Sequence, residues 1–156
     1  MEHTPHVVMV CLGNICRSPI AERVARRLAE EQGLDVRITS AGVSDEEQGN
    51  PIDPRAVEVL AEAGYRTDGH RAHQVTAEEI READLVVAAE QHHVDRMLRL
   101  VPGATNLRLF SDYDPEAADG EGLPDPWYGG MDGFHQTLAA IERSVPGILD
   151  ELTGRR

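Results

Sequence analysis

Four short, mostly apolar runs alternate with helix-like stretches along this chain, and this alternation constrains the fold more than any other feature. The runs are Val7–Val10, Val36–Thr39, Leu85–Ala88 and Asn106–Leu109. Strands that are apolar throughout, instead of at every second position, are typical of a parallel sheet covered on both faces. We therefore expect one doubly wound α/β layer structure with a four-stranded parallel sheet. A length of 156 residues fits a single domain, 1–156.

The stretches between these runs carry the start and stop signals of helices. The expected helices run over 19–33 and 54–64, from a capping box at Thr76, over 94–101 and over 134–149. Asp53 is placed to cap the second helix, and Pro54 suits its first position. Pro146 lies inside the last helix, which we expect it to kink or split.

The composition excludes several classes of function. Fifteen Lys and Arg against 28 Asp and Glu give a formal net charge of −13, which argues against nucleic-acid and anionic-membrane binding. Two cysteines in one loop do not form a disulfide framework. The first residues lack a signal peptide's features, and no apolar run approaches membrane-spanning length. We expect a cytoplasmic protein without nucleic-acid or membrane partners; its oligomeric state stays open, with a monomer favoured.

A thiol, a glycine and an arginine are grouped where the first apolar run ends. The segment reads Cys11-Leu12-Gly13-Asn14-Ile15-Cys16-Arg17-Ser18-Pro19 and leads into a helix. Backbone N–H groups of 12–17, the helix N-terminus and the Arg17 guanidinium together suit a phosphate dianion or another oxyanion. The same positive potential favours the nucleophilic thiolate of Cys11, and the Ser18 hydroxyl can stabilise the sulfur as it leaves. The alternative is a buried cysteine at a helix start, which would need none of these neighbours.

A long polar loop, 111–130, holds a second candidate group. Asp125 lies there between two prolines that stiffen it, and it can protonate a phenolate leaving group and later activate water. Otherwise its Asp-Pro pair is merely a turn. Trp127 and Tyr128 follow directly and suit the wall of a slot for a phenyl ring, or else they anchor the loop to the core. Neither chemical step needs a metal or any other cofactor.

These residues resemble those of the low-molecular-weight protein tyrosine phosphatases. The matching segments are Cys11 to Glu22, Ser40-Ala41-Gly42, Gly49-Asn50-Pro51 with Asp53, His70-Arg71-Ala72 and Pro124 to Gly129. The resemblance implies a flavodoxin-like fold with the phosphate loop after the first strand. It also implies hydrolysis of phosphotyrosine in proteins through a cysteinyl-phosphate, with Cys11 as nucleophile, Arg17 as phosphate clamp and Asp125 as general acid and base.

The same resemblance implies supporting roles around the loop. Asn14, Ser40 and His70 are expected to brace it and to orient the Ser18 hydroxyl, although His70 by itself reads as an ordinary core or surface histidine. Leu12 and Ile15 are expected to contact the substrate ring, as the positions of these two apolar residues inside the loop also suggest. Cys16 is expected to pair reversibly with Cys11 and so protect it from overoxidation; the alternative is a passive buried thiol.

The chain departs from the family where an aromatic wall residue is usual, because Glu46 stands there between Asp45 and Glu47. An acidic wall favours substrates with basic residues around the phosphotyrosine. The alternative is a solvated loop that never meets the substrate. The seven histidines, which include His92 and His93, form no closed ligand set in the sequence, so we expect no metal site.

Three rival functions remain. A protein arginine phosphatase has a similar loop, but Ile15 and the run from Asp125 to Tyr128 argue against that reading. An arsenate reductase needs two further cysteines downstream, and none follows Cys16. A phosphate-binding adaptor without catalysis would have no use for an intact nucleophile, arginine and acid.

Overall fold

A computed structural model describes residues 3–154 of the chain, apart from the side chain of Tyr128. Its centre is a parallel sheet with the strand order β2-β1-β3-β4. The strands are β1 (His6–Cys11), β2 (Arg37–Gly42), β3 (Leu85–Ala88) and β4 (Leu107–Leu109). The order reverses direction at β1, so the sheet is doubly wound, as the sequence predicts.

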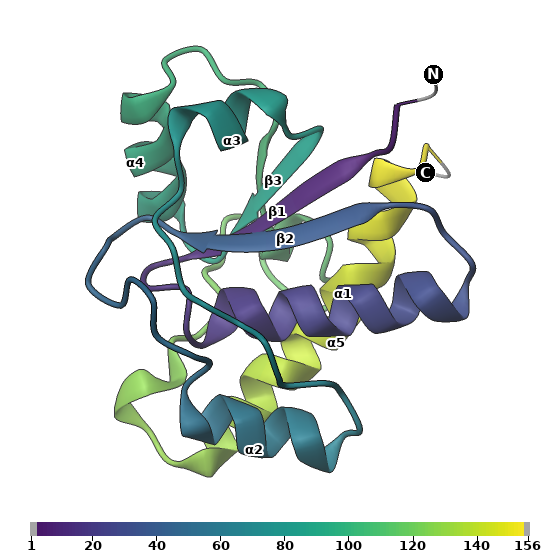
Figure 1. The fold of residues 1–156 in the computed structure, drawn as a ribbon, viewed down its shortest axis with the longest axis vertical. Helices are drawn as coiled ribbons and strands as arrows, with labels where there is room; N and C mark the ends of the chain where they lie inside the picture. The colour runs from purple at the N-terminus through teal and green to yellow at the C-terminus, as the bar shows by residue number, and fades with distance from the viewer. Residues whose placement is uncertain (1–2, 155–156) are drawn as a thin grey trace.

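Helices cover both faces of this sheet (Figure 1). They are α1 (Arg17–Glu31), α2 (Pro54–Glu62), α3 (Ala77–Glu82), α4 (Gln91–Leu100) and α5 (Met131–Leu152), with two short 3₁₀ turns at Phe110–Asp112 and Pro126–Tyr128. Helices α1, α2 and α5 pack on one face, while α3 and α4 lie on the other. The expected α/β layer structure is confirmed.

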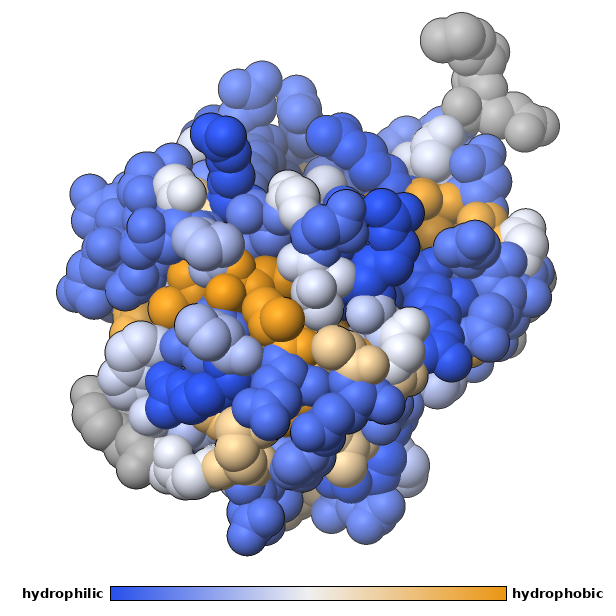
Figure 2. Space-filling view, turned by 60° about the horizontal axis from the view of Figure 1, so that its bottom comes forward, coloured by the Kyte–Doolittle hydropathy of each residue, from blue (hydrophilic) through white to orange (hydrophobic). Residues whose placement is uncertain are grey.

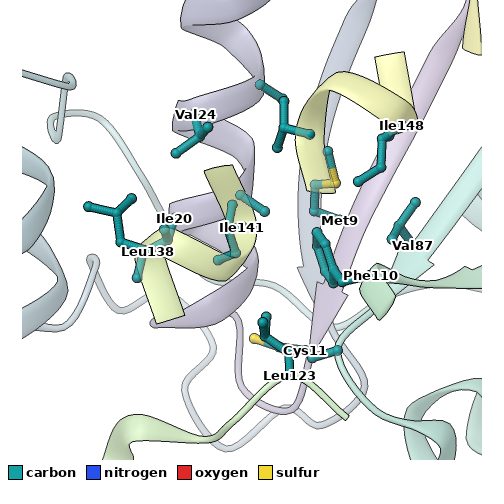
Figure 3. Close-up of a cluster of buried hydrophobic side chains, with 14 of the residues drawn as sticks. Met9, Cys11, Ile20, Val24, Val87, Phe110, Leu123, Leu138, Ile141 and Ile148 are labelled. Carbon is teal, nitrogen blue, oxygen red and sulfur yellow. The ribbon is translucent and has the colours of Figure 1, made fainter. Parts of the chain in front are cut away.

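Alternate residues of β1 point into two separate hydrophobic clusters. Val7, Met9 and Cys11 join the cluster beneath α1 and α5, whereas Val8 and Val10 join the one beneath α3 and α4. This division follows from the two-residue period of a strand, and it explains why the run is apolar throughout. Figure 3 shows Cys11 at the edge of the first cluster, beside Leu123. The central strand therefore begins within the core and ends at the carboxyl edge of the sheet with the Cys11 thiol.

Most element boundaries lie one to three residues from the sequence expectations, and the course of β2, α1 and α5 has a physical reason in each case. Strand β2 continues to Gly42, because Ser40–Gly42 pair in register with the end of β1. Helix α1 begins at Arg17, since a proline at position 19 is tolerated in a first turn. Helix α5 runs unbroken through Pro146, so the predicted split is wrong; the fully buried neighbour Val145 holds this part of the helix against the core.

Gly42 lies against the backbone of the loop that follows β1. A Cβ at this position would stand 2.8 Å from the carbonyl oxygen of Leu12 and 3.1 Å from the amide nitrogen of Asn14. The first distance is shorter than real Cβ contacts, and the second is tighter than most of them. Only glycine therefore lets the second strand approach this loop.

Hydrophilic residues cover most of the face shown in Figure 2, and hydrophobic residues reach this surface in smaller areas. Within residues 3–154, no helix combines the length and the apolar character that crossing a bilayer requires.

Candidate active site

The segment between β1 and α1 forms a tight loop at the carboxyl edge of the sheet, where doubly wound folds bind ligands. Cys11 lies at its base and is 3 % exposed. Its Sγ is 3.0 Å from the Oγ of Ser18 and accepts a hydrogen bond of 3.4 Å from the Ser18 backbone N–H. The sulfur therefore faces both the hydroxyl and the amide of one residue in the first turn of α1.

Asn14 holds this loop through its side chain. Its Nδ2 donates to the Oγ of Ser18 at 2.8 Å and to the Oγ of Ser40 at 3.0 Å. The Ser40 hydroxyl in turn donates to the buried carboxylate of Glu22 at 2.5 Å. Because the Ser18 hydroxyl already accepts from Asn14, its own hydrogen is free to point at the sulfur of Cys11.

The backbone of Asn14 is held as well. Its φ of 62° lies in the left-handed region, which asparagine enters more readily than most residues. The Nε2–H of His70 donates to the Asn14 carbonyl at 2.7 Å, and the backbone N–H of His73 donates to its Oδ1 at 3.1 Å. Burial lowers the pKa of His70, which keeps the ring neutral at pH 7. The three residues expected to brace the loop thus meet in one network.

Arg17 is 2 % exposed, and two groups that the sequence analysis missed fix its guanidinium. Nη1 donates to the Oε2 of Glu90 at 2.8 Å and to the carbonyl of Leu123 at 2.7 Å. Partial burial raises the pKa of Glu90, but the hydrogen bond and charge of Arg17 outweigh it, and the pKa ends below its usual value. Glu90 follows β3 at the same sheet edge as the loop, a signal that the sequence did contain.

Asp125 approaches the loop from the segment before α5. Its Oδ2 lies 3.7 Å from Nη2 of Arg17, and its side chain is 40 % exposed. Its Oδ1 accepts a hydrogen bond of 3.0 Å from the backbone N–H of Trp127, which caps the 3₁₀ turn that follows. The carboxylate therefore has one oxygen fixed by its own turn and one directed toward the phosphate loop.

A further residue that the sequence analysis missed, Arg55, holds this segment in place. Its guanidinium lies 4.9 Å from the ring centre of Trp127 and 4.8 Å from that of Phe134. Its Nη1 also donates to the carbonyl of Trp127 at 2.9 Å. Asp53 accepts from the guanidinium and so fixes its orientation, in addition to capping α2 as predicted.

These groups surround a cavity of about 190 Å³. Its lining residues are Cys11, Leu12, Gly13, Ile15, Cys16, Arg17, Glu46, Glu47, Asp125 and Trp127. Leu12 and Trp127 are substantially exposed beside it, at 36 % and 40 %. The structure thus gathers the predicted slot residues, Glu46 included, except that the side chain of Tyr128 lies outside the described residues.

Cys16 also lines the cavity, and both cysteines are free thiols. Burial foremost, together with the nearby charge of Asp53, raises the pKa of Cys16 far above its usual value. Cys16 is therefore a protonated thiol at neutral pH.

One group of possible metal ligands occurs among the described residues, formed by Glu90, His92 and His93. The Glu90 carboxylate binds Arg17, and Nδ1 of His93 accepts the Glu90 backbone N–H at 3.2 Å. These contacts occupy one carboxylate oxygen of Glu90 and one ring nitrogen of His93, which gives the group a structural role; Nε2 of His93 is buried without a hydrogen-bond partner within residues 3–154.

Comparison with known proteins places this site in a family. Residues 6–156 match the family model described as low molecular weight phosphotyrosine protein phosphatase. A Streptomyces coelicolor low molecular weight protein-tyrosine-phosphatase is 43 % identical over 152 residues, which cover 94 % of this chain and 92 % of that protein.

Solved structures agree with this match. A protein tyrosine phosphatase from Entamoeba histolytica superposes with a TM-score of 0.90 at 26 % identity, covering 98 % of this chain and 100 % of the other. Wzb from Vibrio vulnificus, solved in complex with benzylphosphonate, superposes with a TM-score of 0.83 at 26 % identity, covering 96 % and 100 %. The chain therefore belongs to the low molecular weight phosphotyrosine protein phosphatase family and is a phosphatase enzyme.

Proposed function

We propose that this enzyme hydrolyses phosphotyrosine in proteins, and aryl phosphates, through a covalent phosphate on Cys11. The observation that carries the proposal is the convergence of three groups on one small cavity. The Cys11 sulfur lies 3.0 Å from the Ser18 hydroxyl, and the Arg17 guanidinium next to it lies 3.7 Å from the Asp125 carboxylate. A nucleophile, an anion clamp and a proton donor are what phosphate transfer to sulfur requires.

In the first step, the Cys11 thiolate attacks phosphorus while the loop amides and Arg17 hold the phosphate oxygens. A sulfur–phosphorus bond forms as the bond from phosphorus to the phenolic oxygen breaks. Protonated Asp125 gives its proton to the departing oxygen, so that the phenol leaves neutral.

In the second step, Asp125 reverses its role and takes a proton from water. The water oxygen attacks phosphorus, and the sulfur–phosphorus bond breaks to give inorganic phosphate and the Cys11 thiolate. The Ser18 hydroxyl, oriented by Asn14, donates to the sulfur as its negative charge returns.

The cavity wall supports an aromatic substrate. Leu12, Ile15 and Trp127 offer apolar surface above the phosphate loop, which suits a phenyl ring. Benzylphosphonate, present in the Vibrio vulnificus complex, also joins an aromatic ring to a phosphonate anion. Glu46 at the rim favours substrates with basic residues beside the phosphotyrosine. We also infer a cytoplasmic, reducing setting, because the nucleophile has to remain a free thiol.

Steady-state hydrolysis tests the proposal, with an aryl phosphate and phosphotyrosine peptides as substrates. We expect Cys11→Ser to abolish turnover and Asp125→Asn to lower kcat by about 10²–10⁴-fold. Asp132→Asn, a carboxylate in the first turn of α5, serves as the matched control. Turnover that survives in Cys11→Ser would exclude the covalent mechanism. A preference for phosphoarginine or arsenate over phosphotyrosine, or phosphate binding without turnover, would favour one of the rival functions.

A further inference from the structure

A second polar cavity lies along α1, away from the catalytic loop. Its volume is about 850 Å³, and it extends between the later turns of α1 and the segment after α2. Four arginines and three carboxylates line it, together with two glycines: Arg23, Arg26, Arg27, Arg66, Glu30, Glu31, Asp68, Gly64 and Gly69. We call this cavity the arginine groove. Four arginines in one cavity are unexpected in a chain with a net charge of −13.

Arg23 distinguishes the groove from an ordinary charged surface. Its side chain is only 9 % exposed, and its Nε is buried without a hydrogen-bond partner. The nearest carboxylate oxygen, Oε2 of Glu22, lies 4.0 Å away. That same oxygen binds Arg26 at 2.8 Å, and the other oxygen of Glu22 accepts from Ser40. A guanidinium that is nine-tenths buried, with one carboxylate at 4.0 Å, is costly to keep charged, and an anion in the groove would stabilise that charge.

The other arginines can reach such an anion. Arg66 pairs with Asp68 at 3.2 Å, but both side chains are more than two thirds exposed, at 83 % and 71 %. Arg27 pairs with Glu31 at 3.7 Å, with side chains 46 % and 60 % exposed, and its Nη1 also donates to the carbonyl of Ala63 at 2.9 Å. Exposed pairs of this kind are weak and rearrange at little cost. The groove thus combines a buried cation, Arg23, with Arg27, which is anchored to a backbone carbonyl, and with the exposed Arg66 at its rim.

The groove is also separate from the phosphate loop. Arg23 follows Arg17 by six residues on α1, which corresponds to about 9 Å along the helix axis. No residue lines both cavities. One oxyanion cannot occupy both positions, so each site adds one bound ion to the measured stoichiometry.

We propose that the arginine groove binds a small phosphate-bearing molecule, with one phosphate on Arg23 and a second phosphate or carboxylate group on Arg27 and Arg66. The cavity volume is in the range that small ligands occupy. A guanidinium presents its N–H donors in a planar fork that matches phosphate oxygens. Because the acidic chain repels anions at long range, recognition relies on these local contacts.

Calorimetric titration with inorganic pyrophosphate and with inorganic phosphate tests the proposal. The wild-type protein is expected to bind one more pyrophosphate than Arg23→Met, which keeps the length of the side chain but removes its charge. Arg23→Lys is expected to retain the site with at least tenfold weaker binding. At the groove, pyrophosphate is expected to bind more tightly than phosphate, because only pyrophosphate can reach Arg23 and the rim together.

The matched control is Arg99→Met, which removes an exposed arginine from α4 on the opposite face of the sheet. It should bind as many pyrophosphate ions as the wild type. Equal stoichiometry in the wild type and in a folded Arg23→Met, verified by circular dichroism, would overturn the proposal. If the phosphate loop bound no pyrophosphate, the wild type would show one pyrophosphate site and Arg23→Met would show none. Failure of the proposed function is therefore distinguishable from failure of this one.

Discussion

Asn14 carries the largest number of distinct tasks in the catalytic loop. It supplies a left-handed backbone, accepts from His70 and His73, and donates to Ser18 and Ser40. Among residues 3–154 it is the one non-glycine residue with a positive φ. Substitutions at this single position can therefore distinguish the effect of the left-handed backbone from the effect of the side-chain hydrogen bonds.

We expect Asn14→Gly and Asn14→Ala to lower kcat by at least about tenfold, because three side-chain hydrogen bonds worth about 1 kcal/mol each are lost in both. Asn14→Ala should lose about 1 kcal/mol more unfolding free energy than Asn14→Gly, since only alanine is strained at positive φ. Urea denaturation and steady-state kinetics measure the two effects. Equal stability of the two variants would contradict the assigned backbone strain.

Cys16 permits a test of reversible oxidation. We expect peroxide to oxidise the Cys11 thiolate to a sulfenic acid, with which the Cys16 thiol can condense to a disulfide, releasing water. We expect a reductant to restore activity in the peroxide-treated wild type but not in Cys16→Ser, whose Cys11 oxidises further. The untreated variant should retain turnover and serves as the control. Full recovery of peroxide-treated Cys16→Ser would assign Cys16 a passive role.

At the scale of elements, the segment before α5 depends on α2 for its position. The guanidinium of Arg55, at the start of α2, contacts the rings of Trp127 and Phe134 and donates to the Trp127 carbonyl. The turn that carries Asp125 is thus attached to a helix on a distant part of the chain. This contact therefore fixes the position of Trp127 in the wall of the active-site cavity.

Arg55→Met should therefore raise KM for aryl phosphates more than it lowers kcat. The cation–π contact with Trp127 contributes about 0.5–1 kcal/mol, so an increase in KM of about 2–5-fold is expected. Arg55→Lys keeps the charge but lacks the planar group that stacks. Its KM should therefore lie between those of the wild type and Arg55→Met. The kinetics of both variants check this, and an unchanged KM in Arg55→Met would show that Trp127 is held by other contacts.

The residue patterns alone located those parts of the site whose contacts are local, whereas distant residues such as Ser40 and His70 were named through the family resemblance. The strand, the loop and the start of α1 form one continuous segment, so Cys11 and Arg17 could be placed from their spacing. Glu90 and Arg55 were missed because they reach the site only through sheet order and helix packing, which single-residue patterns do not encode. Pro146 misled for a related reason, since tertiary packing overrides a local helix-breaking tendency.

At the scale of the whole molecule, one buried histidine links folding to pH. His93 is fully buried, and burial chiefly, with the charge of Arg17, lowers its pKa to about 3. In the unfolded chain the pKa is near 6.5, so the unfolded state binds more protons between these two values. Stability from this residue is complete above pH 6.5 and declines as the pH falls toward 3.

We expect the wild type to lose about 2 kcal/mol of unfolding free energy from His93 between pH 7 and pH 5. His93→Gln removes this titration, so its stability should depend less steeply on pH, even if it is less stable at pH 7. His135→Gln, at an exposed pair with Glu62, controls for histidine removal in general. Parallel curves of unfolding free energy against pH for the wild type and His93→Gln would contradict the assignment.

The contact between Gly42 and the phosphate loop makes tolerance of substitution differ between parts of the active site. No side chain fits at position 42 without moving the backbone at Leu12 and Asn14, so the floor of the active site resists mutation. The side chains of Glu46 and Trp127 at the rim border open space, so a substitution there does not displace the loop backbone. Selection for a new substrate, in nature or in the laboratory, would therefore act on the rim while the phosphate-binding floor is inherited unchanged.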